Sequence, residues 1–173
     1  GPTAVGRMTD VEGESPSASA VRSWCEQSEI EWEESAPGSF VIVLPGEQKL
    51  RTTVSVQAGT RLMSLNAFVI RHPDDNTEAI HTWLLERNRK TFGLSYALDQ
   101  HGDIFLVGSL PAGNVTAEDI DDLMGSVLEN ADQVFNHLLE MGFEQAIKAE
   151  WRWRLKAGES TDNLNAFPHL APA

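Results

Sequence analysis

Runs of alternating apolar and polar residues, interrupted by helical segments in a fixed order, constrain the fold of this chain more than any other feature. Three such runs follow one another between residues 39 and 71, separated by turn sequences at 45–47 and 58–60. A period of two predicts strands, and turns this short predict antiparallel pairing. Residues 94–98 and 104–110 form two more runs around a turn that contains glycine, which is typical of a hairpin.

Helical segments surround these strands. We expect one helix before the first strand, beginning near residues 17–19, and another between the third and fourth strands. The last helix follows a capping sequence at 116–119, and its apolar residues recur at spacings of three and four from 120 to 139. Gly142 is expected to cap or interrupt it, with a final helical piece reaching about residue 155.

This order predicts an α+β fold. We expect a single domain with the order αβββαββα, in which a five-stranded antiparallel sheet packs against helices. The domain is placed at residues 19–156. Residues 1–18 are expected to be a tag remnant and a disordered lead-in, because the first two residues are typical of a cleaved tag and the rest are small and polar. Residues 157–173 are expected to form an irregular tail.

Charge limits the classes of partner. The chain has 26 acidic and 13 basic residues, so its net charge is −13. This charge repels phosphate backbones and anionic lipid surfaces, and we expect neither nucleic acid nor a membrane as a partner. It would favour basic partners, but a merely solvated acidic surface is the preferred interpretation. The glutamates between residues 26 and 34 are expected to form such a solvated face.

The residues that commonly carry chemistry are sparse. Cys25 is the only cysteine, which excludes an intramolecular disulfide and favours a cytoplasmic location. Glu26 and Glu29 lie close to it in sequence, and acidic neighbours lower thiol reactivity. The histidines show no metal-ligand spacing, and no phosphate loop or nucleophile motif is present. We therefore expect no metal, no cofactor and no enzymatic activity, and an enzyme with an unrecognised site remains the least favoured alternative.

Tryptophans are the strongest candidates for binding. Trp83 falls on the apolar spacing of the middle helix, where it fits either core packing or an interface. Trp151 and Trp153 belong to a basic aromatic segment, and positions two apart on a helix point about 200° from one another. One of the two should therefore be exposed unless another surface covers it. Docking on the protein's own acidic face and binding of a partner both remain open.

Several stretches of the sequence resemble the YbjN domain family in its actinobacterial branch. The resembling stretches are 37–46, 66–71, 83–88, 97–99, 102–108 and 128–132. The resemblance implies a fold similar to that of type III secretion chaperones and a place among sensory transduction regulators. It also implies dimeric, protein-binding behaviour like that of the chaperones. It implies no catalytic residue, because the family has none that can be carried over.

The leading expectation is thus a non-enzymatic protein-binding domain, chaperone-like or regulatory, that forms a homodimer and captures an extended segment of a client protein. The strand from Phe40 to Leu44 is expected to be an open sheet edge that could accept a client strand. The candidate partner-binding residues are Phe40, Ile42, Leu44, Trp83, Trp151 and Trp153.

A small-molecule sensor is the alternative. Such a protein needs a pocket between the sheet and the helices, with a few converging polar groups. The candidate pocket residues are Asn66, Arg71, Asn88 and Tyr96.

Overall fold

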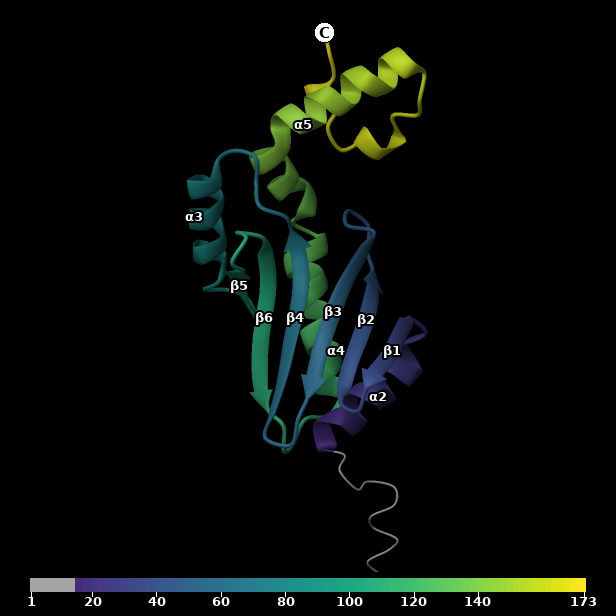
Figure 1. Ribbon diagram of the computed structural model, residues 1–173, viewed down its shortest axis with the longest axis vertical. Helices are drawn as coiled ribbons and strands as arrows, with labels where there is room; N and C mark the ends of the chain where they lie inside the picture. The colour runs from purple at the N-terminus through teal and green to yellow at the C-terminus, as the bar shows by residue number, and fades with distance from the viewer. Residues whose placement is uncertain (1–14) are drawn as a thin grey trace, which may run out of the picture.

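The computed structural model describes residues 15–173 as a twisted sheet with helices behind it and a helical extension beyond one end (Figure 1). The predicted tag remnant and most of the predicted lead-in lie in residues 1–14, outside the described residues. The elements in chain order are α2 (Pro16–Ser28), β1 (Glu31–Ala36), β2 (Ser39–Pro45), β3 (Arg51–Ala58), β4 (Leu62–Ile70), α3 (Thr77–Arg87), β5 (Ser95–Leu98), β6 (Ile104–Pro111), α4 (Ala117–Val127), a π-helical segment (Leu128–Asp132), α5 (Phe135–Ala157) and two 3-10 turns (Asp162–Leu164 and Pro168–Leu170).

The sheet has six strands in the order β1-β2-β3-β4-β6-β5, and every neighbouring pair is antiparallel. The prediction of five strands is therefore wrong, because the glutamate-rich stretch before residue 39 forms β1. The side chains of β1 alternate between the two faces of the sheet, as those of β2 do. Glu31 and Glu33 lie opposite Val43 and Val41, whereas Trp32 lies opposite Ile42. A strand at the edge of a sheet tolerates charged residues on its solvent-facing side. The alternation of apolar and polar residues that predicts a strand is therefore not visible in β1.

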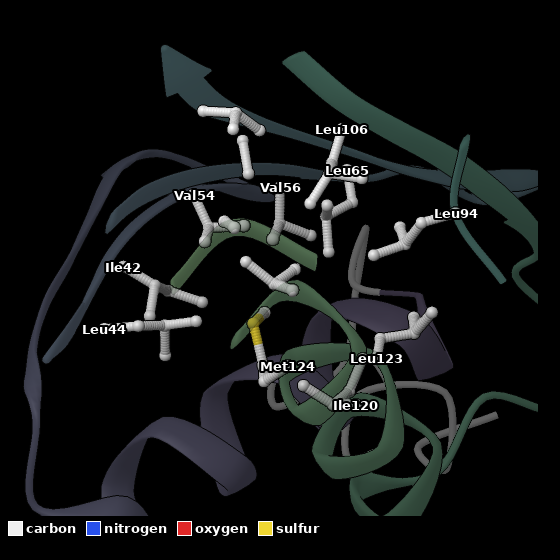
Figure 2. Close-up of a cluster of buried hydrophobic side chains, with 14 of the residues drawn as sticks. Ile42, Leu44, Val54, Val56, Leu65, Leu94, Leu106, Ile120, Leu123 and Met124 are labelled. Carbon is white, nitrogen blue, oxygen red and sulfur yellow. The ribbon is translucent and has the colours of Figure 1, made fainter. Parts of the chain in front are cut away.

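One face of the sheet carries the hydrophobic core. α4 crosses behind the strands, and no helix covers the face that points toward the viewer in Figure 1. Figure 2 shows the core residues of this layer, with Val56, Leu65 and Leu106 on the strands pointing toward Ile120 and Met124 on α4. All five are buried, so the sheet and α4 stabilise one another by removing apolar surface from water.

The amphipathic stretch from 120 to 139 is not one continuous α-helix. The predicted cap is confirmed: the Thr116 hydroxyl accepts from the Asp119 amide, and the Asp119 carboxylate accepts from the Thr116 amide. α4 then widens into the π-helical segment, and α5 begins after a short break. The predicted interruption at Gly142 is also confirmed, because Phe143 leaves helical geometry at φ −139° and ψ 27°.

The end of the chain forms a second, smaller core. Beyond the kink, α5 extends past the sheet, and the residues after Ala157 fold back along it (Figure 1). The buried members of this small cluster are Ile147, Trp151, Leu164, Phe167 and Leu170. The Trp151 indole N–H donates to the Phe167 carbonyl over 3.0 Å, which fixes the tail against the helix. We call residues 143–173 the C-terminal arm.

Candidate functional site

A concave apolar surface lies between α2, α4 and the end of β2. It encloses about 710 Å³, a volume within the range of protein binding sites. Its apolar lining consists of Trp24, Ile30, Leu44, Pro45, Met124 and Leu128. We call this surface the α2–α4 groove. The two helices contact one another, and the groove follows α4 from Ala117 and ends at Leu128, just beyond the helix.

The rim of the groove is acidic. Glu118 and Asp121 line it from α4, and no lysine or arginine is among the described residues that do so. Asp121 accepts a hydrogen bond of 3.0 Å from the Trp24 indole, which holds the two helices in register and orients that ring. The groove can therefore receive apolar side chains while its rim attracts positive charge.

The free edge of the sheet adjoins this groove. Ile30 lines the groove and directly precedes β1, which is the last strand on its side of the described sheet. Along β1, the Glu34 carboxylate points back toward α2 and accepts hydrogen bonds from the Arg22 Nε and Nη2 atoms. It also accepts from the Gly38 amide at 2.9 Å. The Gly38 amide, with the Arg22 guanidinium, lowers the pKa of the Glu34 carboxyl. This strand therefore offers an acidic edge of six residues.

The opposite edge of the sheet is closed by side chains. The Asn88 carboxamide accepts from the Tyr96 amide at 2.7 Å and donates to the Tyr96 carbonyl at 3.4 Å, so it occupies the outward backbone groups of β5. The Thr91 hydroxyl donates to the Leu94 carbonyl next to them. A further strand would have to displace these side chains, whereas none of the hydrogen bonds described for residues 15–173 caps the β1 backbone in this way.

The prediction that β2 is an open edge is wrong. β1 pairs with β2 on one side and β3 pairs with it on the other. Phe40, Ile42 and Leu44 are buried in the core, and only Leu44 also contributes to the groove. Phe40, Ile42 and Leu44 are apolar because they face the core, whereas Val41 and Val43 between them are half-buried on the other face of the sheet.

The three candidate tryptophans occupy different environments. Trp83 is half-buried on α3, with its ring centroid 5.2 Å from that of His137 and the Arg87 guanidinium carbon 5.4 Å away. Trp151 is buried in the arm, whereas Trp153 is 56% exposed. This confirms that the two cannot both face one core. Trp151 packs in the apolar cluster of its own arm, and not on an acidic face of the protein.

The four candidate pocket residues do not converge. Asn66 lies exposed on the sheet face that no helix covers, and Arg71 pairs with Asp74 at 2.8 Å while stacking over Phe143. Only Asn88 and Tyr96 come together, in the edge cap described above. The apolar cavity beside them, near Leu85 and Leu98, has a volume of about 150 Å³, which is below the usual size of a small-molecule site.

The sequence did not single out the polar residues that anchor the sheet to the π-helical segment. The Asp132 carboxylate is buried and accepts from the amides of Gln48 and Lys49 at 2.8 and 2.7 Å. Gly46 lets this carboxylate approach, because a Cβ atom there would lie 2.6 Å from its Oδ1 atom. Gly46 and Asp132 lie in stretches that carry the family resemblance, and that was the available signal.

A second anchor surrounds Asn130. Its side chain accepts from the Arg87 guanidinium at 2.9 Å and donates to the Ser126 carbonyl at 2.9 Å. The Tyr96 hydroxyl donates to the Asn130 carbonyl at 2.6 Å, and burial raises the pKa of Tyr96 to about 12. These bonds satisfy backbone and side-chain groups that a π-helical turn would otherwise bury unpaired.

Reactive chemistry is hard to place on this surface. Burial, reinforced by the charge of Glu26, raises the pKa of the Cys25 thiol to about 11, which keeps the thiol protonated and unreactive. Within residues 15–173, no three side chains among His, Cys, Asp and Glu gather into a metal-binding group. None of the helices in the described part of the chain is long and apolar enough to cross a bilayer.

Comparison with known proteins agrees with this geometry. An uncharacterized protein of Mycobacterium tuberculosis is 46% identical over 137 residues, covering 79% of this chain and 75% of that protein. One of Mycobacterium leprae is 46% identical over 131 residues, with 76% and 71% covered. Among solved structures, the heterodimeric ExoU–SpcU complex from the Pseudomonas aeruginosa type III secretion system is similar in fold, with a TM-score of 0.50 at 13% identity. That match covers 70% of this chain and 96% of the other.

A family assignment follows from the sequence itself. Residues 17–140 match the family described as "YbjN: Putative bacterial sensory transduction regulator". The matched range contains the whole sheet, α4 and both polar anchors, and it ends just before the kink that begins the C-terminal arm. The chain belongs to the YbjN family.

Proposed function

We propose that this protein is a non-enzymatic binding domain, chaperone-like or regulatory, that captures an extended segment of a client protein. The observation that carries the proposal is the continuity of the free β1 edge with the α2–α4 groove through Ile30. A client strand would add to β1 by main-chain hydrogen bonds, and its apolar side chains would enter the groove. The family description as a regulator and the fold shared with a chain of a heterodimeric secretion complex support this reading.

The charge of the site selects the client. β1 presents Glu31 and Glu33, and the rim of the groove adds Glu118 and Asp121. We therefore propose a client segment in which apolar residues alternate with lysine or arginine. The lone cysteine is compatible with a reducing compartment, and we propose a cytoplasmic location on that ground.

A labelled model peptide tests the proposal. The probe is a peptide of about ten residues that alternates lysine with valine or leucine, long enough to cover β1, and its binding is measured by fluorescence anisotropy. Glu33→Lys and Glu118→Lys should each weaken binding roughly tenfold, which corresponds to about 1.4 kcal/mol. Gly125 lines the groove, and a Cβ atom there meets no neighbour, so the helix should accept a side chain at this position. The side chain introduced by Gly125→Arg should then block entry of the peptide into the groove.

Two controls separate specific capture from attraction to a protein of net charge −13. Glu159→Lys makes the same charge change on an exposed residue of the arm, far from β1, and should leave binding unchanged. A peptide with proline at every second position cannot add to a sheet edge and should not bind. Equal weakening by Glu159→Lys, or equal binding of the proline peptide, would refute capture at this site.

We also propose that the protein works as a homodimer. Trp153 is 56% exposed on the C-terminal arm, and tryptophan is enriched at protein interfaces, so we take its surroundings as part of the contact between copies.

A further inference from the structure

The C-terminal arm exposes a face that its own tail does not cover. The tail packs on the side of α5 that carries Ile147 and Trp151. The other side presents Trp153, with Arg152 one position before it and Lys156 one turn after it, and all three are exposed. Neither Arg152 nor Lys156 has an ion-pair partner among the described residues.

The arm is held rigidly enough to act as a unit. The Arg154 guanidinium pairs with Glu150 at 2.6 Å and donates to the Ser160 carbonyl at 2.9 Å, and the Trp151 indole donates to the tail. Gly158 ends the helix in the left-handed conformation, with φ of 72°. The exposed face is therefore presented on a formed helix, so a partner does not have to order it on binding.

This face matches the α2–α4 groove in charge and in apolar character. The arm offers one large aromatic side chain between two cations. The groove offers an apolar floor that includes Trp24 and Met124, beside the carboxylate of Glu118. Tryptophan flanked by cations is a common anchor of protein interfaces, and ion pairs at the rim give such contacts their orientation.

The two surfaces cannot meet within one molecule. The arm extends beyond one end of the sheet, whereas α2, one wall of the groove, lies toward the other end (Figure 1). A second copy in the opposite orientation can bring its arm to the groove of the first and receive the first arm in its own groove. Such a reciprocal exchange is closed after two copies, which is the commonest symmetry of oligomers.

We propose that the free protein is a two-fold dimer in which Trp153 of each copy occupies the α2–α4 groove of the other, with Arg152 and Lys156 beside Glu118. We assigned the same groove to a client above. The proposed dimer rests on that proposed function only for one consequence, which is that client and arm compete for the groove. The contact between copies stands without any client.

Light scattering after size exclusion, on the protein alone, tests the dimer. The wild type should show twice the 19.0 kDa of one chain, and rising salt should lower that mass because the rim is ionic. Trp153→Ala should raise the dimer dissociation constant roughly 30-fold or more. At Gly125 a Cβ atom meets no neighbour, and Gly125→Arg, which places a charged side chain in the groove, should have the same effect.

Mixing the two variants identifies the contact. Trp153→Ala keeps an intact groove and Gly125→Arg keeps an intact arm, so each alone is a monomer while the mixture forms a heterodimer through one contact. Leu85→Ser, on the exposed apolar edge of α3, is the matched control and should leave the dimer intact.

Three outcomes overturn the proposal: a monomeric wild type, a dimer split by Leu85→Ser but not by Trp153→Ala, or a mass that grows beyond two copies with concentration. None of them depends on the peptide assay. Failure of the peptide to bind Trp153→Ala, whose groove no arm occupies, would instead refute the proposed function and leave the dimer standing.

Discussion

Tyr96 gives the most direct test of the anchor that joins β5 to the π-helical segment. It is the only tyrosine of the chain and is buried, and its hydroxyl donates to the Asn130 carbonyl at 2.6 Å. Burial raises the pKa of Tyr96 from 10.0 to about 12, against a smaller opposing effect of the Arg87 charge. Ionisation would place a buried anion against a carbonyl oxygen that has lost its donor, so the folded state resists it.

The sign of the resulting pH dependence follows from proton counts. Between pH 10 and 12 the unfolded chain has released the Tyr96 proton while the folded chain still holds it, so the free energy of unfolding falls as pH rises. The difference between a pKa of 10.0 and one of about 12 corresponds to about 3 kcal/mol in full, reached only above pH 12. At pH 11 about 1 kcal/mol of this should be lost, and almost none at pH 8.

Other groups titrate in the same pH range. Comparing the wild type with Tyr96→Phe cancels their contributions to the free energy of unfolding. Burial raises the pKa of the Cys25 thiol to about 11, so stability falls above its ordinary value of 9.0 for the same reason. Burial lowers the pKa of Lys49, so its folded form loses its proton first and stability rises there with pH. Both effects are present in wild type and variant, and they cancel in the difference because the sites are independent.

Urea unfolding followed by far-ultraviolet circular dichroism measures that difference. At pH 8, Tyr96→Phe should be less stable by about 1–3 kcal/mol, because the buried Asn130 carbonyl loses its partner. By pH 11 the difference in the free energy of unfolding should narrow by about 1 kcal/mol. A direct absorbance titration of tyrosinate, which only this residue can give, should place its pKa near 12. A gap that stays constant from pH 8 to 11, or a tyrosinate pKa near 10, would show that the hydroxyl is neither buried nor bonded as described.

Three further substitutions test local features by the same unfolding assay. Thr52→Val should stabilise the protein by about 1 kcal/mol, because the Thr52 hydroxyl is buried without a hydrogen-bond partner among the described residues; destabilisation would indicate an undetected partner. Asp132→Ala should cost about 2 kcal/mol or more, since two amides of the β2–β3 turn lose their acceptor, and a cost below about 0.5 kcal/mol would contradict this. Gly102→Ala should cost about 1–2 kcal/mol, because its φ is 81° and a Cβ atom would overlap the His72 ring; a neutral result would show that the turn relaxes.

Local pattern was sufficient for the central strands and for the capping of α4. β3 and the following strands have one buried face each, so their residues must alternate, and the alternation is visible in the sequence. The cap at Thr116 is equally local, because the donors and acceptors lie within four residues. In these elements the features that fix the structure are local, so the types of the residues are enough to predict them.

The strand β1 was missed because an edge strand follows a different rule. Its outward residues face solvent on two sides, and charge there prevents further pairing, so Glu31 and Glu33 look like a solvated run. Because the sequence does not predict β1, it places β2 at the edge of the sheet and assigns the buried residues of β2 to a binding surface. Only the pairing of β1 with β2, which is a long-range fact, distinguishes the two.

The anchors were missed for a related reason. Asp132 and Asn130 lie within an apparently regular amphipathic helix, and their partners are more than thirty residues away in sequence, except for Ser126. The spacing of apolar residues indicates which side of a helix is buried. It does not reveal a polar residue whose hydrogen-bond partner is a backbone amide in a distant turn. The π-helical segment exists because these partners hold it.

The distribution of charge, and not its sum, decides what this protein can bind. A net charge of −13 argues against polyanionic partners, and that argument treats the surface as uniform. The structure separates it into an acidic groove and β1 edge at one end and a basic aromatic face at the other. Two copies in opposite orientation would bring unlike surfaces together, whereas two in the same orientation would juxtapose like ones. The same acidic groove would attract a basic client, so in this proposal a single surface would serve both partners. The affinity of the arm would then set how strongly a client must bind to replace it.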